Sequence, residues 1–295
     1  MKVKKLFVIS LLLFISMTGN AQEFEEPQEP EEPAVVKFKN LLSVKFTVGY
    51  NFMFFQETTP REDSYQTNRP LDIGGGIGIK NVFFSFSFSI PFLYDTKYRK
   101  SPSLDFGFNY YYKDIFYTTG FIKYYGGFHN HTVGNIDLQI LTIGFSQEFL
   151  LNRNHSLRSV YNLDERQTRS NGSFILGAGA FFTAIQSDTL DNYNDNRRAI
   201  HLGPNFGYSY TWVFKNNMFL NLLSTFGIDL LIPIDDRKVS SGFQVLPRFS
   251  FGYHGKTWAA NIYFIYSLLQ GGFYTDREYN LLSGNMGIAF VKRFL

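Results

Sequence analysis

The sequence predicts an all-β protein that crosses a membrane as an antiparallel β-barrel of about twelve strands, within a range of roughly ten to fourteen. Three observations predict it. Aromatic residues make up 19% of the 295 residues, whereas charged residues make up only 18%. Apolar and polar residues alternate with period two from Leu41 onward, in runs long enough for a tilted crossing of about 9–11 residues. Tight turns alternate with long polar loops, which is typical of outer-membrane barrels.

The first 21 residues have the organisation of a secretory signal peptide. Lys2, Lys4 and Lys5 precede an apolar run at 6–15, and small residues at 19–21 provide a cleavage site. The apolar run is too short for a membrane-spanning helix, which needs about 20 residues. We therefore expect an exported mature chain that begins at Gln22.

Residues 22–39 have the composition of an acidic Glu/Pro linker, which we expect in the periplasm. Prolines at three-residue spacing favour an extended, solvated conformation, and the alternative is an arm that binds a partner or cations. Without the signal peptide the chain holds 25 basic and 25 acidic residues, since the three lysines leave with it. This balance indicates no nucleic-acid partner. The chain has no cysteine, so disulfides, thiolate metal sites and a lipoprotein anchor are excluded.

The barrel is predicted to occupy residues 40–295, with an apolar face toward lipid and a small or polar face toward the lumen. Alternation across a strand assigns the two faces. The first strand carries its apolar face at Leu42, Val44, Phe46, Val48, Tyr50, Phe52 and Phe54. The expected inner face, where small side chains would leave room for water, includes Gly74, Gly76, Ser85, Ser87, Gly107, Asn109, Gly203, Asn205, Gly207 and Ser209.

The strand count depends on residues 150–200. Residues 155–168 and 171–186 both alternate like strands, but counting both gives thirteen and breaks the alternation of short and long connections. Bacterial barrels have even strand numbers. We therefore interpret the region as one crossing, interrupted at 167–172.

Charged residues on this interrupted strand form the one candidate site. Arg158, Asp164 and Arg166 fall on one strand face, and Arg169 lies nearby. If that face lines the lumen, these side chains form an ion-pair network that stabilises the barrel or sets ion selectivity. A specific site for an anionic ligand is the alternative.

Other candidates for chemistry are weak, and we predict no catalytic residues, no metal site and no cofactor. His129 and His131 lack a third metal ligand. The run from Asp188 to Asp195 lacks the glycine and glutamate that a calcium loop requires. His201 could approach Ser209 or Asp229 across neighbouring strands, but serine and aspartate are common here.

Several segments together resemble a family of Bacteroidetes outer-membrane proteins, domain of unknown function 4421. These segments are residues 69–78, 83–88, 105–110, 126–128 and 167–173, and their order and spacing carry the resemblance over about residues 40–295. The resemblance implies an outer-membrane barrel. It implies no activity.

These features predict a narrow pore or small-solute uptake channel of the outer membrane, or a membrane-structural barrel. The alternatives are a barrel enzyme acting on lipid or peptide, and a surface-binding or adhesion barrel. The expected partners are outer-membrane lipid and, during biogenesis, the barrel-assembly machinery, because the chain ends in an alternating strand with a penultimate aromatic, Phe294. The sequence does not identify the solute.

Overall fold

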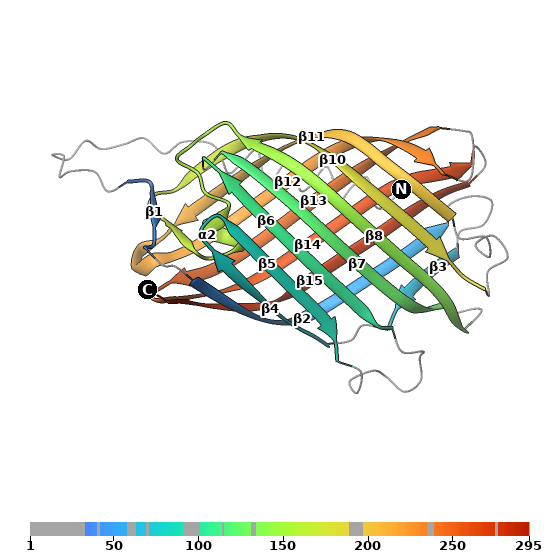
Figure 1. The fold of residues 1–295 in the computed structure, drawn as a ribbon, viewed down its shortest axis with the longest axis horizontal. Coiled ribbons are helices and arrows are strands. Elements are labelled where there is room, and N and C mark those ends of the chain that lie inside the picture. The colour runs from blue at the N-terminus through green and yellow to red at the C-terminus, as the bar shows by residue number, and fades with distance from the viewer. Residues whose placement is uncertain are drawn as a thin grey trace. The chain divides into compact units, whose positions relative to one another are not determined.

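Twelve antiparallel strands close into a barrel in the computed structural model (Figure 1). Each barrel strand pairs with its neighbours along the chain, and β15 pairs with β2 to close the ring. The structure thus confirms the all-β class and the predicted twelve crossings. The barrel strands are β2 (Leu42–Glu57), β4 (Leu71–Ile79), β5 (Val82–Ser89), β6 (Ser103–Tyr112), β7 (Phe116–Asn130), β8 (Gly134–Leu150), β10 (Asn171–Gln186), β11 (Arg197–Val213), β12 (Met218–Pro233), β13 (Ser240–His254), β14 (Trp258–Tyr274) and β15 (Arg277–Phe294).

The structure describes residues 33–39, 42–57, 63–68, 71–90, 101–113, 115–130, 134–188, 197–234, 239–274 and 277–294. The predicted signal peptide and the acidic tract up to residue 32 lie outside these residues. Within them, no helix has the length and apolar character needed to cross a membrane.

The outer face of the barrel is apolar, as the alternation predicts. Phe206 of β11 is 55% exposed on this face, whereas Ser209 on the inward face of the same strand is 0% exposed. Exposed aromatic and aliphatic side chains recur around the ring, among them Phe46, Phe84, Phe106, Phe145, Leu176, Ile228, Phe251, Ile262 and Ile288. So large a continuous apolar surface is suited to lipid and not to water, and the closed barrel leaves no strand edge unpaired in the hydrocarbon.

The inward glycines allow neighbouring strands to approach closely. A Cβ added at Gly74 would lie 2.6 Å from the Oγ1 of Thr47 and 2.7 Å from the Cβ of Ser87, and one added at Gly207 would lie 2.7 Å from the Cγ2 of Thr225. The inward placement of these glycines was expected, but the expectation that they leave room for water is wrong at these two positions. The space is already occupied by side chains of adjacent strands.

Leu42 and Phe294, the two ends of the barrel sequence, lie at one end of the barrel together with the tight turns after β4, β6, β11 and β13, and this end is here called the turn end. The opposite end, called the loop end, carries the long connections and also two short ones, between β7 and β8 and between β14 and β15. At the loop end a short strand, β3 (Asp63–Thr67), reduces the number of strands in the ring. Along β2, β4 pairs as far as Tyr50 and β3 pairs from Phe54 onward. Since β3 also pairs with β7, the ring here consists of ten strands, β2, β3, β7, β8 and β10 to β15. The polar stretch between β2 and β4 is therefore not a simple loop, because residues 63–67 within it form a strand.

Apolar side chains fill the lumen inside this narrower ring. Phe55 from β2, Leu138 from β8 and Leu231 from β12 point into the lumen, where a water-filled channel would leave them exposed. All three are 0% exposed. They belong to one buried cluster, here called the loop-end cluster, which draws on nine of the ten strands. Its members are Met53, Phe55, Tyr65, Tyr125, Phe128, Ile136, Leu138, Ile140, Ile185, Ala199, Leu231, Leu269, Tyr279 and Leu281.

At the turn end, the connection between β8 and β10 folds into the lumen. These residues, 151–170, are called the insert below, and they contain α2 (Arg158–Tyr161) and β9 (Glu165–Gln167) (Figure 1). The interpretation of 155–168 as part of one interrupted crossing is wrong, because β10 alone makes that crossing. Apolar residues of the insert, such as Leu157 and Leu163, alternate in sequence as they would on a strand, but they contact the inner side of the barrel wall.

The chain that leads into β2 pairs with the insert. β1 (Val35–Lys37) and β9 form a separate antiparallel sheet in which Val36 lies opposite Arg166. Thr168 extends the pairing through its backbone N–H, which donates to the carbonyl of Ala34 at 3.0 Å. Part of the predicted 22–39 linker is therefore an ordered strand.

Candidate functional site

The insert reaches different sectors of the barrel wall with apolar side chains. Leu157 joins a buried cluster with side chains of β6, β7, β8, β10 and β12, while Val160 and Leu163 join a second cluster with β12, β14 and β15. All three are 2% exposed or less. The wall residues are Tyr111, Tyr117, Leu150, Ile175 and Leu223 in the first cluster, and Phe219, Ala259 and Val291 in the second.

Polar wall residues satisfy the backbone of the insert. The last carbonyls of a short helix have no partner within the helix, so a buried helix end needs donors from elsewhere. Here inward side chains of β2, β13, β14 and β15 supply them. The Nζ of Lys45 donates to the carbonyl of Tyr161 (2.8 Å), the Nε2 of His254 to Ser159 (2.8 Å), the Nδ2 of Asn261 to Val160 (3.3 Å) and the Nη1 of Arg293 to Leu163.

Arg158 is the centre of a buried charge network within the insert. Its Nη2 lies 2.7 Å from the Oδ2 of Asp164, and its Nη1 lies 3.4 Å from the Oε1 of Glu165. The same guanidinium donates to the carbonyl of Lys80 at 2.7 Å, which ties the insert to the turn between β4 and β5. Burial raises the pKa of Glu165 above its ordinary value, although the Arg158 charge opposes the shift. A buried network of this kind holds a segment in one position only if the arginine and its carboxylates stay paired.

The predicted charge cluster is only partly assembled. The structure brings Arg158 and Asp164 together and adds Glu165 to them. Arg166 points elsewhere, and its Nη1 donates to the Oδ1 of Asn217 in the turn between β11 and β12 at 3.0 Å. Arg169 is exposed at the end of the insert. The four residues do not share a strand face, because the segment is not a strand.

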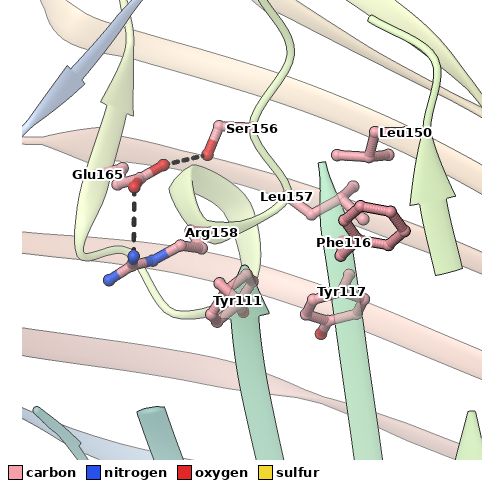
Figure 2. A pocket seen from close by; sticks show the side chains of 8 residues that line it. All are labelled: Tyr111, Phe116, Tyr117, Leu150, Ser156, Leu157, Arg158 and Glu165. Carbon is pink, nitrogen blue, oxygen red and sulfur yellow. Dashed lines mark hydrogen bonds and ion pairs between the residues drawn. The ribbon is translucent and has the colours of Figure 1, made fainter. Parts of the chain in front are cut away.

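A small cavity lies between the insert and the wall, where Figure 2 shows Ser156 and Glu165 on one side and the rings of Tyr111 and Tyr117 on another. The Oγ of Ser156 donates to the Oε2 of Glu165 at 2.6 Å. The cavity has room for about one water molecule. It is too small for a substrate, so we interpret it as part of the packing between the insert and the wall.

Histidine contacts also differ from those considered from sequence. Ser209 is engaged by His155 of the insert, whose Nε2 lies 2.9 Å from its Oγ, and Asn221 donates to the same oxygen at 3.0 Å. His201 instead faces the hydroxyl of Tyr279 at 3.4 Å. Ser209 and His155 are 0% and 1% exposed, so this pair fixes the insert and is not accessible to a substrate.

The weak metal candidates acquire other partners where they are described. His129 lies 2.7 Å from the Nε2 of Gln66, and the backbone of Asp188 donates to Asp137 at 2.9 Å. His131 and residues 191–195 lie outside the described residues. Across the described ranges, no group of three or more His, Asp or Glu side chains is placed to hold a metal ion.

Comparison with known proteins identifies the family. A family model described as a domain of unknown function, DUF4421, matches residues 35–294, nearly the whole described chain. The chain belongs to the DUF4421 family. The family is described as a domain of unknown function, so the match carries no activity with it. No curated protein matches the sequence.

Solved outer-membrane barrels resemble this DUF4421 chain only in general form. The translocator domain of the autotransporter NalP from Neisseria meningitidis has 13% identity and a TM-score of 0.42, with 86% of this chain and 88% of that one covered. The toluene transporter TodX from Pseudomonas putida has 6% identity and a TM-score of 0.32, with 87% and 90% covered. A FadL homologue from Pseudomonas aeruginosa has 7% identity and a TM-score of 0.34, with 87% and 91% covered. Scores this low carry no functional argument.

Three functional wall residues of this DUF4421 chain were not singled out from sequence. Lys45 and Arg293 donate to the insert, and the guanidinium of Arg248 lies 5.0 Å from the centre of the Tyr161 ring. Each stands at an inward position beside small or uncharged side chains of the same face. A lysine or arginine side chain at such a position needs a hydrogen-bond partner inside the lumen. The sequence therefore contained a signal that could have predicted a segment folded into the barrel.

Proposed function

We propose that the protein is a membrane-structural barrel of the outer membrane whose lumen does not conduct in the state described. The observation that carries the proposal is the filling of the lumen at both ends. The insert, with its buried Arg158 network, occupies the turn end. The loop-end cluster occupies the other end with apolar side chains.

Conduction of ions or polar solutes needs a continuous path of water or polar groups through the barrel. The loop-end cluster interrupts such a path, since its aliphatic and aromatic side chains are at most 6% exposed and leave no space for a column of water. At the turn end, side chains from β2, β13, β14 and β15 are already bonded to insert carbonyls. Opening the turn end would therefore break several buried hydrogen bonds together.

A small-solute channel gated by the insert is the second candidate. The specific observation in its favour is that four carbonyls of the insert are held by polar side chains of the wall, and water can replace these contacts when the segment leaves the lumen. An enzyme is less favoured, because the contact between the His155 ring and the Ser209 hydroxyl is buried.

Orientation follows from the usual placement of short turns in the periplasm. With the turn end in the periplasm, the insert closes the periplasmic side, and the predicted acidic arm is periplasmic because the chain enters the barrel at that end. The lumen-charge residues then serve structure and not ion selectivity. For biogenesis we infer recognition of β15 by the barrel-assembly machinery, since Ile288, Phe290 and Phe294 face outward on that strand.

Single-channel recording in planar bilayers tests the proposal. Folded wild-type protein and the Arg158→Ala variant, both checked by heat-modifiable electrophoretic mobility, should give no current steps. Steps in the wild type that become more frequent in Arg158→Ala would favour the gated channel. Steps in the wild type that Arg158→Ala leaves unchanged would contradict both candidates, because they would require a path that bypasses the insert.

A further inference from the structure

Every connection between barrel strands at the turn end carries an exposed basic side chain. The five connections join β4 to β5, β6 to β7, β8 to β10, β11 to β12 and β13 to β14. Lys292 on the outward face of β15 adds a cation where the ring closes. Each connection contributes one exposed residue, in chain order Lys80, Lys113, Arg153, Lys215 and Lys256, and together with Lys292 these are called the cationic ring; Arg169, also exposed in the connection from β8 to β10, is not counted in it.

The cationic ring is not neutralised by the acids described near it. Asp164 and Glu165 are 5% and 3% exposed and are paired with Arg158. Among the described residues, no member of the ring forms an ion pair. Asp114, which follows Lys113 in the sequence, lies outside the described residues. The ring therefore presents positive charge to its surroundings.

Turn geometry does not account for these lysines. Lys80 and Lys113 have φ values of 53° and 50°, in the left-handed region where glycine or asparagine fits with less strain. The turn between β11 and β12 shows the usual solution, with Asn216 and Asn217 in that conformation next to Lys215. Lysine at the two strained positions thus points to a need for its charge.

Exposed aromatic side chains lie beside the ring and mark the level of the membrane interface. Tyr112, Phe214 and Trp258 are 46%, 48% and 41% exposed, each within two residues of a ring lysine. The Nζ of Lys113 lies 5.1 Å from the centre of the Tyr112 ring. Aromatic rings and lysines with long aliphatic stems gather at the headgroup region of bilayers.

We propose that the cationic ring binds the phosphate groups of anionic phospholipids in the leaflet that borders the turn end. The distribution of charge favours lipid over a protein or polymer partner. Cations spread over all five connections around the perimeter match lipids that surround the barrel, whereas a macromolecule docking on the barrel axis needs its charges gathered there. Lipid attraction of this kind acts through several single cations and weakens within a Debye length.

Thermal unfolding in vesicles of defined composition tests the proposal. The wild type is reconstituted in phosphatidylcholine alone and in phosphatidylcholine with about one-third phosphatidylglycerol. We expect a higher unfolding midpoint in the anionic vesicles and a smaller difference at high salt. The variant K113Q/K215Q/K256Q removes three positive charges and should lose most of that difference. The variant K113R/K215R/K256R keeps the charges and should keep the difference.

A matched control removes the same number of charges from the same end but from residues outside the cationic ring. K37Q/K39Q/R169Q changes exposed residues of the β1 region and the end of the insert, and it should keep the full difference between the two vesicles. Loss of the difference in this control, with retention in K113Q/K215Q/K256Q, would overturn the proposal and indicate an anionic macromolecule or segment near the axis. The outcome does not depend on whether the barrel conducts.

Discussion

Arg158 carries the largest predicted effect of any single residue in the insert. Replacing it with alanine leaves Asp164 and Glu165 buried without their cation, and such unpaired charges typically cost about 3–5 kcal/mol. We expect Arg158→Ala to lower the free energy of unfolding by about that amount, measured by urea titration in vesicles. Arg153→Ala, in the same segment but exposed, is the control; in vesicles of phosphatidylcholine alone, which offer the cationic ring no anionic lipid, it should change the free energy by less than about 0.5 kcal/mol. Equal effects of the two substitutions would show that the network does not hold the insert.

His155 makes the insert sensitive to acid. Burial lowers the pKa of His155 from 6.5 to about 4, so the unfolded chain binds its proton more readily than the folded chain. Stability from this group is therefore present above about pH 6.5 and is lost as the pH falls toward 4. Between pH 7 and pH 5 the expected loss is about 2 kcal/mol.

The measurement compares unfolding free energies of the wild type and His155→Asn at both pH values. His155→Asn should reduce the difference between pH 7 and pH 5, since the neutral amide does not titrate. Glu165 has a raised pKa and acts in the opposite direction, but it is present in both proteins and cancels in the comparison. An unchanged pH dependence in the variant would assign the acid sensitivity to another group.

Among the elements, the β1–β9 sheet links the start of the barrel to the insert, and a disulfide can test its register. Val36 and Arg166 are direct cross-strand partners, a spacing that a disulfide can bridge. The chain has no native cysteine, so Val36→Cys with Arg166→Cys should form one crosslink on mild oxidation, seen as a mobility shift that reductant reverses. Val35→Cys with Arg166→Cys is the control, because adjacent residues of a strand face opposite sides. Efficient crosslinking of the control would place β1 in another register.

The same elements mark the limit of sequence-based prediction. Period two identified the twelve crossings and their outward faces, because lipid imposes that pattern on every strand. It failed in the insert, where Leu157 and Leu163 alternate with charged residues but pack against different walls. Leu163 also ends α2 with φ of 59°, a position where glycine is the usual helix-stop signal. β3 was missed because a strand of 5 residues within a polar stretch has no distinct pattern.

At the scale of the whole molecule, the barrel depends on an outer surface that only lipid can cover. Phe206 lies near the middle of β11, points outward with 55% of its side chain exposed, and pairs across the sheet with Leu176 and Phe226. Arginine at the bilayer midplane of such barrels costs about 2–4 kcal/mol. Phe206→Arg should therefore lower the free energy of unfolding in vesicles by about that amount, measured by urea titration of the heat-modifiable form, while Phe206→Leu should lower it by less than about 1.5 kcal/mol. Because arginine on a water-facing surface costs almost nothing, a Phe206→Arg variant as stable as Phe206→Leu would mean that this face does not lie in the membrane.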